Sequence, residues 1–275
     1  MAGVNVFEVL APGIVSTVQD LGRFGGARYG VATSGALDGF ALRAGNLLVG
    51  NDESAAAVET TLMGLRIKVL RDALVAVTGG DLQPRTANGP LPMWRSHLLR
   101  EGEVLVFAGP ACGLRAYLAV AGGIQVAPVL GSRSTNLASG FGGFEGRALR
   151  QGDILAAAPA PDPLRGADRA FPPEALPVYA SPWRLRIVWG PQDDHFSEEG
   201  RQTFVAAAFT VSPSTTVAIC ALIPVSDTAG TAATAPPSAT AVPERAAFAS
   251  SARRASTIRA PQRVSIWPGA AFWLS

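Results

Sequence analysis

The chain has 275 residues, 48% of them hydrophobic, and a formal net charge of +2. This length is large for one domain and comfortable for two. Residues 213–275 carry an excess of three positive charges, so the preceding part of the chain carries one net negative charge. A near-neutral body lacks the basic surface of a nucleic-acid binder, so nucleic acid is excluded as a partner.

The sequence also argues against a membrane or secreted protein. No apolar run approaches the roughly 20 residues that a spanning helix needs, and no signal peptide precedes Val4. The two cysteines, Cys112 and Cys220, lack metal-ligand spacing and are expected to be buried free thiols. We therefore expect a cytoplasmic protein with no membrane partner.

Short apolar runs rich in Val, Leu and Ile predict a mainly β protein. The predicted strands cover residues 4–10, 14–18, 65–70, 74–78, 104–107, 115–121 and 154–157. Asn88-Gly89 is the strongest hairpin signal, because both residues tolerate the positive φ of a type I′ turn. Residues 99–105 and 149–155 resemble each other, which predicts two similar tight turns. Many short strands at this spacing indicate a barrel or a sandwich.

Helices are expected to be few and short. Apolar residues recur at helical spacing over residues 40–48. We expect Ser34 to cap this helix, Asp38 to lie near its positive end and Gly50 to follow its last turn. Asp38 and Asn46 lie just over two turns apart and could share one helix face. Further helices are expected over residues 53–58 and 198–206.

Composition divides the chain into several parts. We expect a first β domain over residues 1–160, a Pro/Ala-rich linker over 161–182, the start of a second β domain over 183–212, and a low-complexity tail over 213–275. Within the second β domain, strands are expected over residues 183–189 and 209–211. The tail is rich in Ala, Pro, Ser and Thr, a composition that buries little apolar area.

Familiar catalytic and metal-binding patterns are not found. His97 and His195 are the only histidines, and neither adjoins a GxSxG-type sequence. Asp193-Asp194-His195 is the one cluster of potential metal ligands, and the polar start of a helix explains it better. No GxxxxGK[ST] loop is present, and Lys68, the sole lysine, lies in a predicted strand.

Residues 15–51 hold the densest group of polar side chains and glycines, which is typical of functional loops. Gln19, Asp20 and Arg23 place an amide, a carboxylate and a guanidinium within five residues. These groups could bind a polar planar ligand. The alternative is an Asp–Arg pair that only makes the loop rigid.

Six segments, in order along the chain, closely resemble the A/B-domain family of biotin-dependent carboxyltransferases. They are TVQDLGR (17–23), GVATSGALDGFALRAGNLLVGN (30–51), GGD (79–81), YLAVAGGI (117–124), VLGSRST (129–135) and GPQDDHF (190–196). The family includes the C subunit of 5-oxoprolinase, allophanate hydrolase subunit 2 and the matching half of the urea carboxylase carboxyltransferase domain. The resemblance runs from about residue 7 to residue 213.

The resemblance implies cyclophilin-like β-barrel domains with a few short helices and no metal. It also implies a C/D-domain partner subunit, similar to the B subunit of 5-oxoprolinase, and a protein like the A subunit of that enzyme. Together these proteins would open 5-oxoproline to glutamate at the expense of ATP. No cofactor is expected on this chain alone, since ATP would belong to the complex.

The resemblance leaves two other functions open. One alternative is carboxyl transfer to urea from carboxybiotin supplied by another protein. A second is a regulatory module that antagonises a kinase inhibitor without chemistry.

Seven residues on the family motifs are expected to form the site. The expected catalytic residues are Gln19, Asp20 and Arg23. The expected substrate-binding residues are Ser34, Asp38, Asn46 and Arg133. No metal ligand is expected.

The tail departs from the family. Members continue into a second barrel that includes a Gln-Asp-Arg-Met-Gly-like stretch and a Thr-Gly-Gly-Tyr-Pro motif, and neither occurs here. Residues 214–217 can be encoded by AGC-ACG-ACC-GTN, and these codons, read one base earlier after a C, give Gln-His-Asp-Arg. We hypothesise that the chain from about residue 214 is a frameshifted translation, which leaves the second barrel incomplete.

Overall fold

The computed structural model describes residues 3–159, 167–179, 189 and 193–207, with the backbone of residues 209–211 and 222–224. The chain divides into two compact units, one formed by Met1–Arg186 with Trp267–Ser275 and the other by Ile187–Ile266. Most of the strand expected over residues 183–189, and the tail from residue 213 apart from that short piece of backbone, lie outside the described residues.

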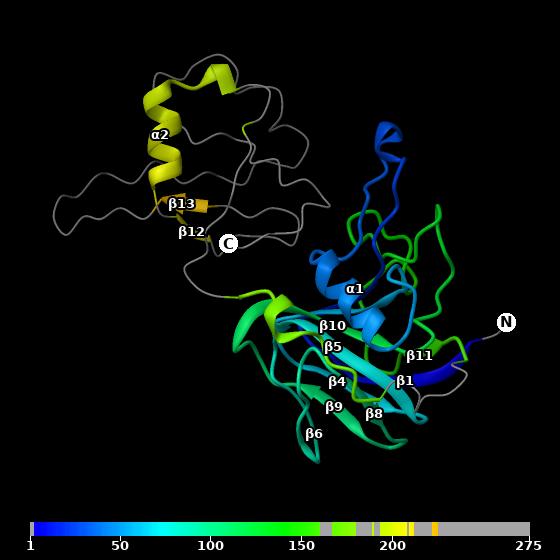
Figure 1. The fold of residues 1–275 in the computed structure, drawn as a ribbon. Helices are drawn as coiled ribbons and strands as arrows, with labels where there is room; N and C mark the ends of the chain where they lie inside the picture. The colour runs from blue at the N-terminus through cyan, green and yellow to red at the C-terminus, as the bar shows by residue number, and fades with distance from the viewer. Residues whose placement is uncertain are drawn as a thin grey trace. The chain divides into compact units, whose positions relative to one another are not determined.

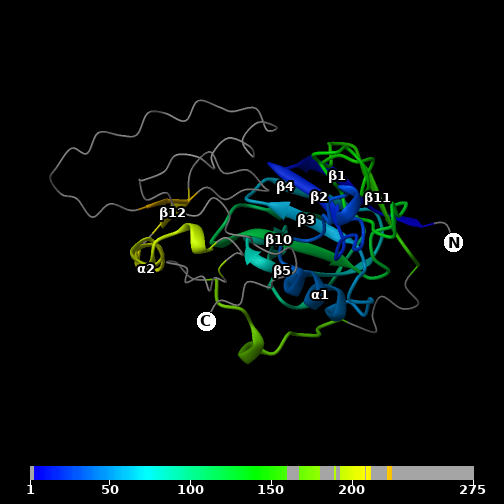
Figure 2. The same cartoon turned by 90° about the horizontal axis from the view of Figure 1, so that it is seen from above.

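The described part of the first unit contains two antiparallel sheets (Figures 1 and 2). The six-stranded sheet has the order β11-β1-β4-β9-β6-β7, and the five-stranded sheet has the order β2-β3-β10-β5-β8. The first is built from β1 (Val4–Pro12), β4 (Leu65–Val69), β6 (Pro84–Thr86), β7 (Gly89–Pro90), β9 (Val104–Phe107) and β11 (Ile154–Ala157). The second is built from β2 (Val15–Gln19), β3 (Ala57–Thr61), β5 (Ala73–Asp81), β8 (Ser96–Leu99) and β10 (Cys112–Val120).

The fold is mainly β, as predicted, but these strands do not close into the expected barrel. Strands β11 and β7 end the first sheet, and β2 and β8 end the second. The chain passes from β1 to β2 through Gly13, whose φ is +70°; a Cβ there would lie 2.6 Å from the Met63 carbonyl oxygen. This tight corner sends consecutive strands into different sheets, so the result is two packed sheets.

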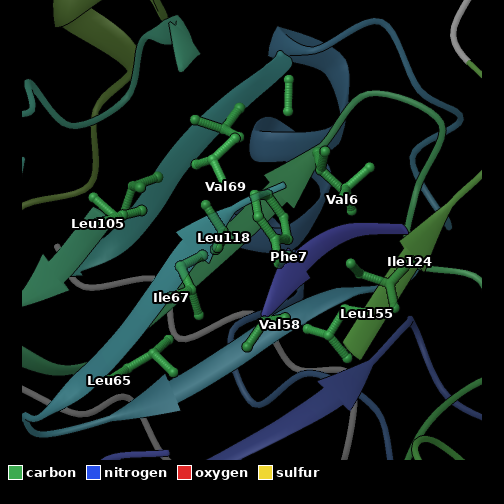
Figure 3. Packing of buried hydrophobic residues seen from close by; sticks show 14 of the residues in the cluster. Val6, Phe7, Val58, Leu65, Ile67, Val69, Leu105, Leu118, Ile124 and Leu155 are labelled. Carbon is green, nitrogen blue, oxygen red and sulfur yellow. The ribbon is translucent and has the colours of Figure 1, made fainter. Parts of the chain in front are cut away.

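The main hydrophobic core lies between the two sheets (Figure 3). In β4, Leu65, Ile67 and Val69 are buried and alternate with exposed Arg66 and Lys68. Strands β3, β5 and β10 of the other sheet supply the opposing side chains. Full burial of such a side chain stabilises a fold by roughly 1.5–3 kcal/mol, so this cluster is the main source of stability.

Helix α1 (Gly39–Leu48) covers the outer face of the five-stranded sheet. It was predicted from its apolar spacing, and Gly50 follows it with a φ of +78° as expected. The predicted cap is wrong. Asp38, and not Ser34, is the N-cap, because its carboxylate accepts the Ala41 N–H at 2.9 Å.

Two further local predictions need correction. Residues 53–58 do not form a helix; the buried apolar run that ends at Val58 enters β3, which pairs with both β2 and β10. The hairpin near Asn88 is confirmed, but its pairing of Thr86 with Gly89 places the two-residue turn at Ala87-Asn88.

The two similar tight turns are confirmed. Gly102 and Gly152 both have a φ of +87°, and their N–H groups donate to carbonyls of β4 and β1, each at 2.8 Å. The carboxylates of Glu103 and Asp153 accept the N–H of the arginine three residues earlier, at 2.6 and 2.7 Å. The repeated sequence therefore encodes one turn structure used twice.

Residues 167–179, part of the expected linker, belong to the first unit and pack beside α1 and β8. Phe171 packs against Phe40 and Trp94, with both ring-centroid distances at 5.6 Å. The Phe171 N–H also donates to the Trp94 carbonyl at 2.9 Å. This segment, which includes the short 3₁₀ helix η2 (Pro173–Ala175), therefore covers one side of α1.

The described part of the second unit is small. It contains η3 (Asp193–His195), α2 (Glu198–Ala206) and the antiparallel pair β12 (Phe209–Val211) and β13 (Leu222–Pro224). The predicted helix over 198–206 and the predicted strand over 209–211 are confirmed. In the described part of the chain, no helix is long and apolar enough to cross a membrane.

Candidate functional site

Asp20 joins the loop after β2 to a second loop, residues 129–136. It is 8% exposed. Its carboxylate accepts four hydrogen bonds, from the N–H groups of Gly22 and Arg133 and from the hydroxyls of Ser132 and Ser134. These bonds measure 2.5–2.7 Å. Because its oxygens are occupied by the protein's own donors, Asp20 holds the two loops together.

Arg23 lies between the same two loops and is 3% exposed. Its Nη1 donates to the Ser34 hydroxyl at 2.9 Å, and its Nη2 donates to the Ser134 carbonyl. The guanidinium also lies over the Phe141 ring, 4.7 Å from its centroid. Burial lowers the pKa of Arg23, and the nearby Asp20 charge opposes this effect. No ion pair joins Asp20 to Arg23 among the described residues, so the simple Asp–Arg pair does not form.

Gln19 and Arg133 take part differently. The Gln19 Nε2 donates to the Thr17 hydroxyl at 3.0 Å and to the Thr135 carbonyl at 3.3 Å, while its Oε1 is buried without a hydrogen-bond partner. The Arg133 guanidinium donates to the Val126 carbonyl at 3.1 Å. Arg133 therefore meets Asp20 through its backbone.

A second network lies at the start of α1. The Asp38 N–H donates to the Tyr117 hydroxyl at 2.8 Å, and that hydroxyl donates to Glu59 at 2.7 Å. Glu59 also accepts the Leu37 N–H at 3.0 Å, and the Asp38 carboxylate accepts the Tyr179 hydroxyl at 2.8 Å. Burial raises the pKa of Tyr117 and of Tyr179, and the adjacent carboxylates raise both further. Both phenols therefore remain protonated donors.

Asn46 does not join either network. It is fully buried near the end of α1, where its amide donates to the Ala55 carbonyl at 2.7 Å and the Glu53 carbonyl at 3.3 Å. Its Oδ1 accepts from Asn51 at 3.0 Å. Asn46 therefore fixes the turn between α1 and β3.

The structure thus brings five of the seven expected residues to one place, with Asp38 at the edge and Asn46 elsewhere. The sequence reasoning missed Glu59, Tyr117 and Tyr179. An acidic residue within the apolar strand β3 was the available signal for Glu59. Within the described ranges, no group of three His, Cys, Asp or Glu side chains could hold a metal ion.

The first unit is thus a two-sheet β domain with two loops joined by Asp20 and Arg23, and its fold is that of carboxyltransferase domains of known structure. Residues 29–244 match the model of the family described as carboxyltransferase domain, subdomain A and B, and the chain belongs to this family. The resemblance inferred from the motifs is confirmed.

Known proteins place the chain among two kinds of relatives. It is 39% identical over 210 residues to the C subunit of Escherichia coli 5-oxoprolinase, covering 75% of this chain and 65% of that protein. It is 34% identical over 222 residues to the urea amidolyase of Lachancea kluyveri, covering 74% of this chain and 12% of that protein. The solved K. lactis urea amidolyase superposes with a TM-score of 0.73 at 33% identity, over 82% of this chain and 14% of that one.

Proposed function

We propose that this chain is the C subunit of an ATP-dependent 5-oxoprolinase, which opens the ring of 5-oxoproline to give glutamate. The observation that carries the proposal is the 39% identity over 210 residues to a protein of that name. Such a protein is one part of a larger enzyme. The proposed partners are therefore a C/D-domain subunit, similar to the B subunit of 5-oxoprolinase, and a protein like its A subunit, all in the cytoplasm.

In this proposal Asp20 and Arg23 position the site. Both are buried, and their polar atoms bond to groups of the chain itself. They would hold the 129–136 loop and the segment at Ser34 around the substrate. Gln19 and Asp38 would lie beside these two segments and contribute to the surface that faces the substrate.

Two common phosphate-binding features are not found at the candidate site among the described residues. Lys68, the sole lysine, is exposed on β4, which belongs to the sheet without β2, β3 and β10. Asp38 is the N-cap of helix α1, so its carboxylate lies at the helix N-terminus, where anions usually bind. This negative charge would repel a phosphate group there. We therefore assign the nucleotide to a partner of this chain and derive no step through it.

The test is reconstitution. The full chain would be co-expressed with the two proposed partners, and glutamate release from 5-oxoproline would be followed with and without ATP. We expect ATP-dependent release that is lost when this chain is omitted. Full release by the two partners without this chain would refute the proposal.

Carboxyl transfer to urea is the second candidate, favoured by the urea amidolyase matches in sequence and structure. The same preparation, supplied with urea, bicarbonate, ATP and a biotin carboxylase with its biotinylated carrier, distinguishes the two. Urea-dependent ATP consumption without 5-oxoproline turnover would favour this candidate.

A further inference from the structure

Arg115 is a partly buried arginine, and two of its side-chain donor atoms are buried without a hydrogen-bond partner. Its side chain, on β10, is 12% exposed. The Arg115 Nε lies 3.7 Å from the Glu59 Oε1, which is too long for a hydrogen bond. Neither Nε nor Nη1 has a hydrogen-bond partner. Buried donors left without acceptors are costly, so each one requires an explanation.

The negative charge of Glu59 balances the positive charge of Arg115, but Glu59 accepts no hydrogen bond from the Arg115 Nε or Nη1. The Glu59 Oε2 already accepts the Tyr117 hydroxyl and the Leu37 N–H. The carboxylate is therefore held toward the start of α1. The guanidinium retains capacity for another anionic oxygen.

The backbone around Arg115 is shaped by a β-bulge. Cys112 pairs with Asp81 and Ala116 pairs with Gly79, so β10 carries two extra residues opposite β5. Gly79 has a φ of +90°, and a Cβ there would lie 2.7 Å from the Arg115 carbonyl oxygen. Bulges redirect side chains and are frequent beside active sites. The GGD motif thereby acquires a physical reason, because its first glycine permits the bulge that presents Arg115.

Guanidinium groups bind carboxylates through paired, charge-assisted hydrogen bonds. Arg115 adjoins Glu59, which connects it to the Leu37–Asp38 backbone of the second network. We propose that Arg115 binds the carboxylate group of the substrate. This inference rests on the proposed function: 5-oxoproline carries a carboxylate, whereas urea carries none.

The assembled complex tests the inference through steady-state kinetics. Arg115→Lys keeps the positive charge but loses the paired N–H donors of the guanidinium. The double variant Arg115→Gln/Glu59→Gln removes both charges, so that no unpaired carboxylate is left buried. We expect the KM for 5-oxoproline to rise at least about tenfold, with kcat changing less than about threefold. Arg66→Gln, at an exposed position on β4, is the control and should leave KM unchanged. An unchanged KM in both Arg115 variants would overturn the inference.

A binding measurement separates failure of this inference from failure of the proposed function. Calorimetry on the same complex would compare 5-oxoproline with 2-pyrrolidinone, the analogue that lacks the carboxylate. We expect the wild type to bind 5-oxoproline at least about tenfold more tightly, and the double variant to bind both alike. Absence of turnover with this binding pattern refutes only the proposed function. Equal binding of the two compounds to the wild type refutes only the role of Arg115, whereas binding of neither refutes the proposed function and the inference together.

Discussion

The Tyr179 hydroxyl donates a hydrogen bond of 2.8 Å to the carboxylate of Asp38, a residue 141 positions earlier in the chain. Asp38 uses its other oxygen to cap α1 and its N–H to contact Tyr117. One residue near the end of the 167–179 segment therefore supports the start of the helix that covers the second sheet.

Replacing Tyr179 with Phe should weaken this support. A hydrogen bond to a charged group contributes about 1.5–3 kcal/mol, so the free energy of unfolding should fall by roughly that amount. Urea denaturation measures the loss. Tyr29→Phe, at a side chain that is 73% exposed, is the matched control. Equal stability of the two variants would show that the Asp38 contact contributes nothing.

Asp20→Ala should release the 129–136 loop. Four donors would lose their acceptor, and each buried unsatisfied donor costs about 1–3 kcal/mol, so we expect a loss of about 3 kcal/mol or more. Limited proteolysis should then cut within this loop. Asp52→Ala removes an exposed turn carboxylate and should leave the cleavage pattern as in the wild type. A protected loop in Asp20→Ala would contradict the positioning role.

Stability should depend on pH through Asp153. Burial alone would raise the pKa of Asp153, but hydrogen bonds from Arg147 and from the Arg150 N–H outweigh it and hold the pKa below the usual 3.8. The unfolded chain then binds more protons as pH falls through about 4. The stabilisation is therefore complete above this range and is lost as pH falls further, toward the folded-state pKa.

Asp153→Asn should flatten this dependence. Denaturation midpoints measured between pH 7 and pH 3 should fall more steeply for the wild type than for the variant. Parallel curves would show that Asp153 titrates alike in the folded and unfolded chains.

The bulge beside Arg115 predicts a difference between two glycines with nearly the same φ. Gly102→Ala meets nothing within 4 Å and should cost about 1–2 kcal/mol from the left-handed backbone alone. Gly79→Ala adds the 2.7 Å approach to the Arg115 carbonyl oxygen and should cost clearly more. Thermal unfolding of both variants measures the difference. Similar losses would show that the bulge relaxes to accept a side chain.

The frameshift hypothesis makes a prediction about the gene. Translating the nucleotide sequence after codon 213 in the other two frames should give a Gln-Asp-Arg-Met-Gly-like stretch and, later, a Thr-Gly-Gly-Tyr-Pro motif. An accurate nucleotide sequence without either motif in any frame would refute the hypothesis.

The local sequence pattern was sufficient to predict those helices and strands that bury one face. The short apolar run at residues 65–70 and the helical spacing over residues 40–48 predicted β4 and α1. It was insufficient at β3, because a short apolar run suits a helix or a strand, and pairing with β2 and β10 decides between them. Ser34 and Asp38 are both good caps by residue type. The bond from the Asp38 N–H to Tyr117 helps to fix the choice.

The site was predictable where its residues share a loop. Gln19, Asp20 and Arg23 stand together in the sequence and in the structure. Glu59 and Arg115 come from different strands, and only the register of β3 with β10 brings them side by side. Sequence spacing carries no such information, so this pair was missed.

The similarity between the turns at Gly102 and Gly152 continues in the pairing of the strands that follow them. Phe7 of β1 pairs with Leu155 of β11, and the matching pair on the other side is Ile67 of β4 with Leu105 of β9. Since β1 and β4 are antiparallel neighbours, exchanging β1 with β4 and β11 with β9 maps one strand pair onto the other. The pairing register therefore repeats about a local pseudo-two-fold axis between β1 and β4, and one turn-and-strand pattern, used twice, places β11 beside β1 and β9 beside β4.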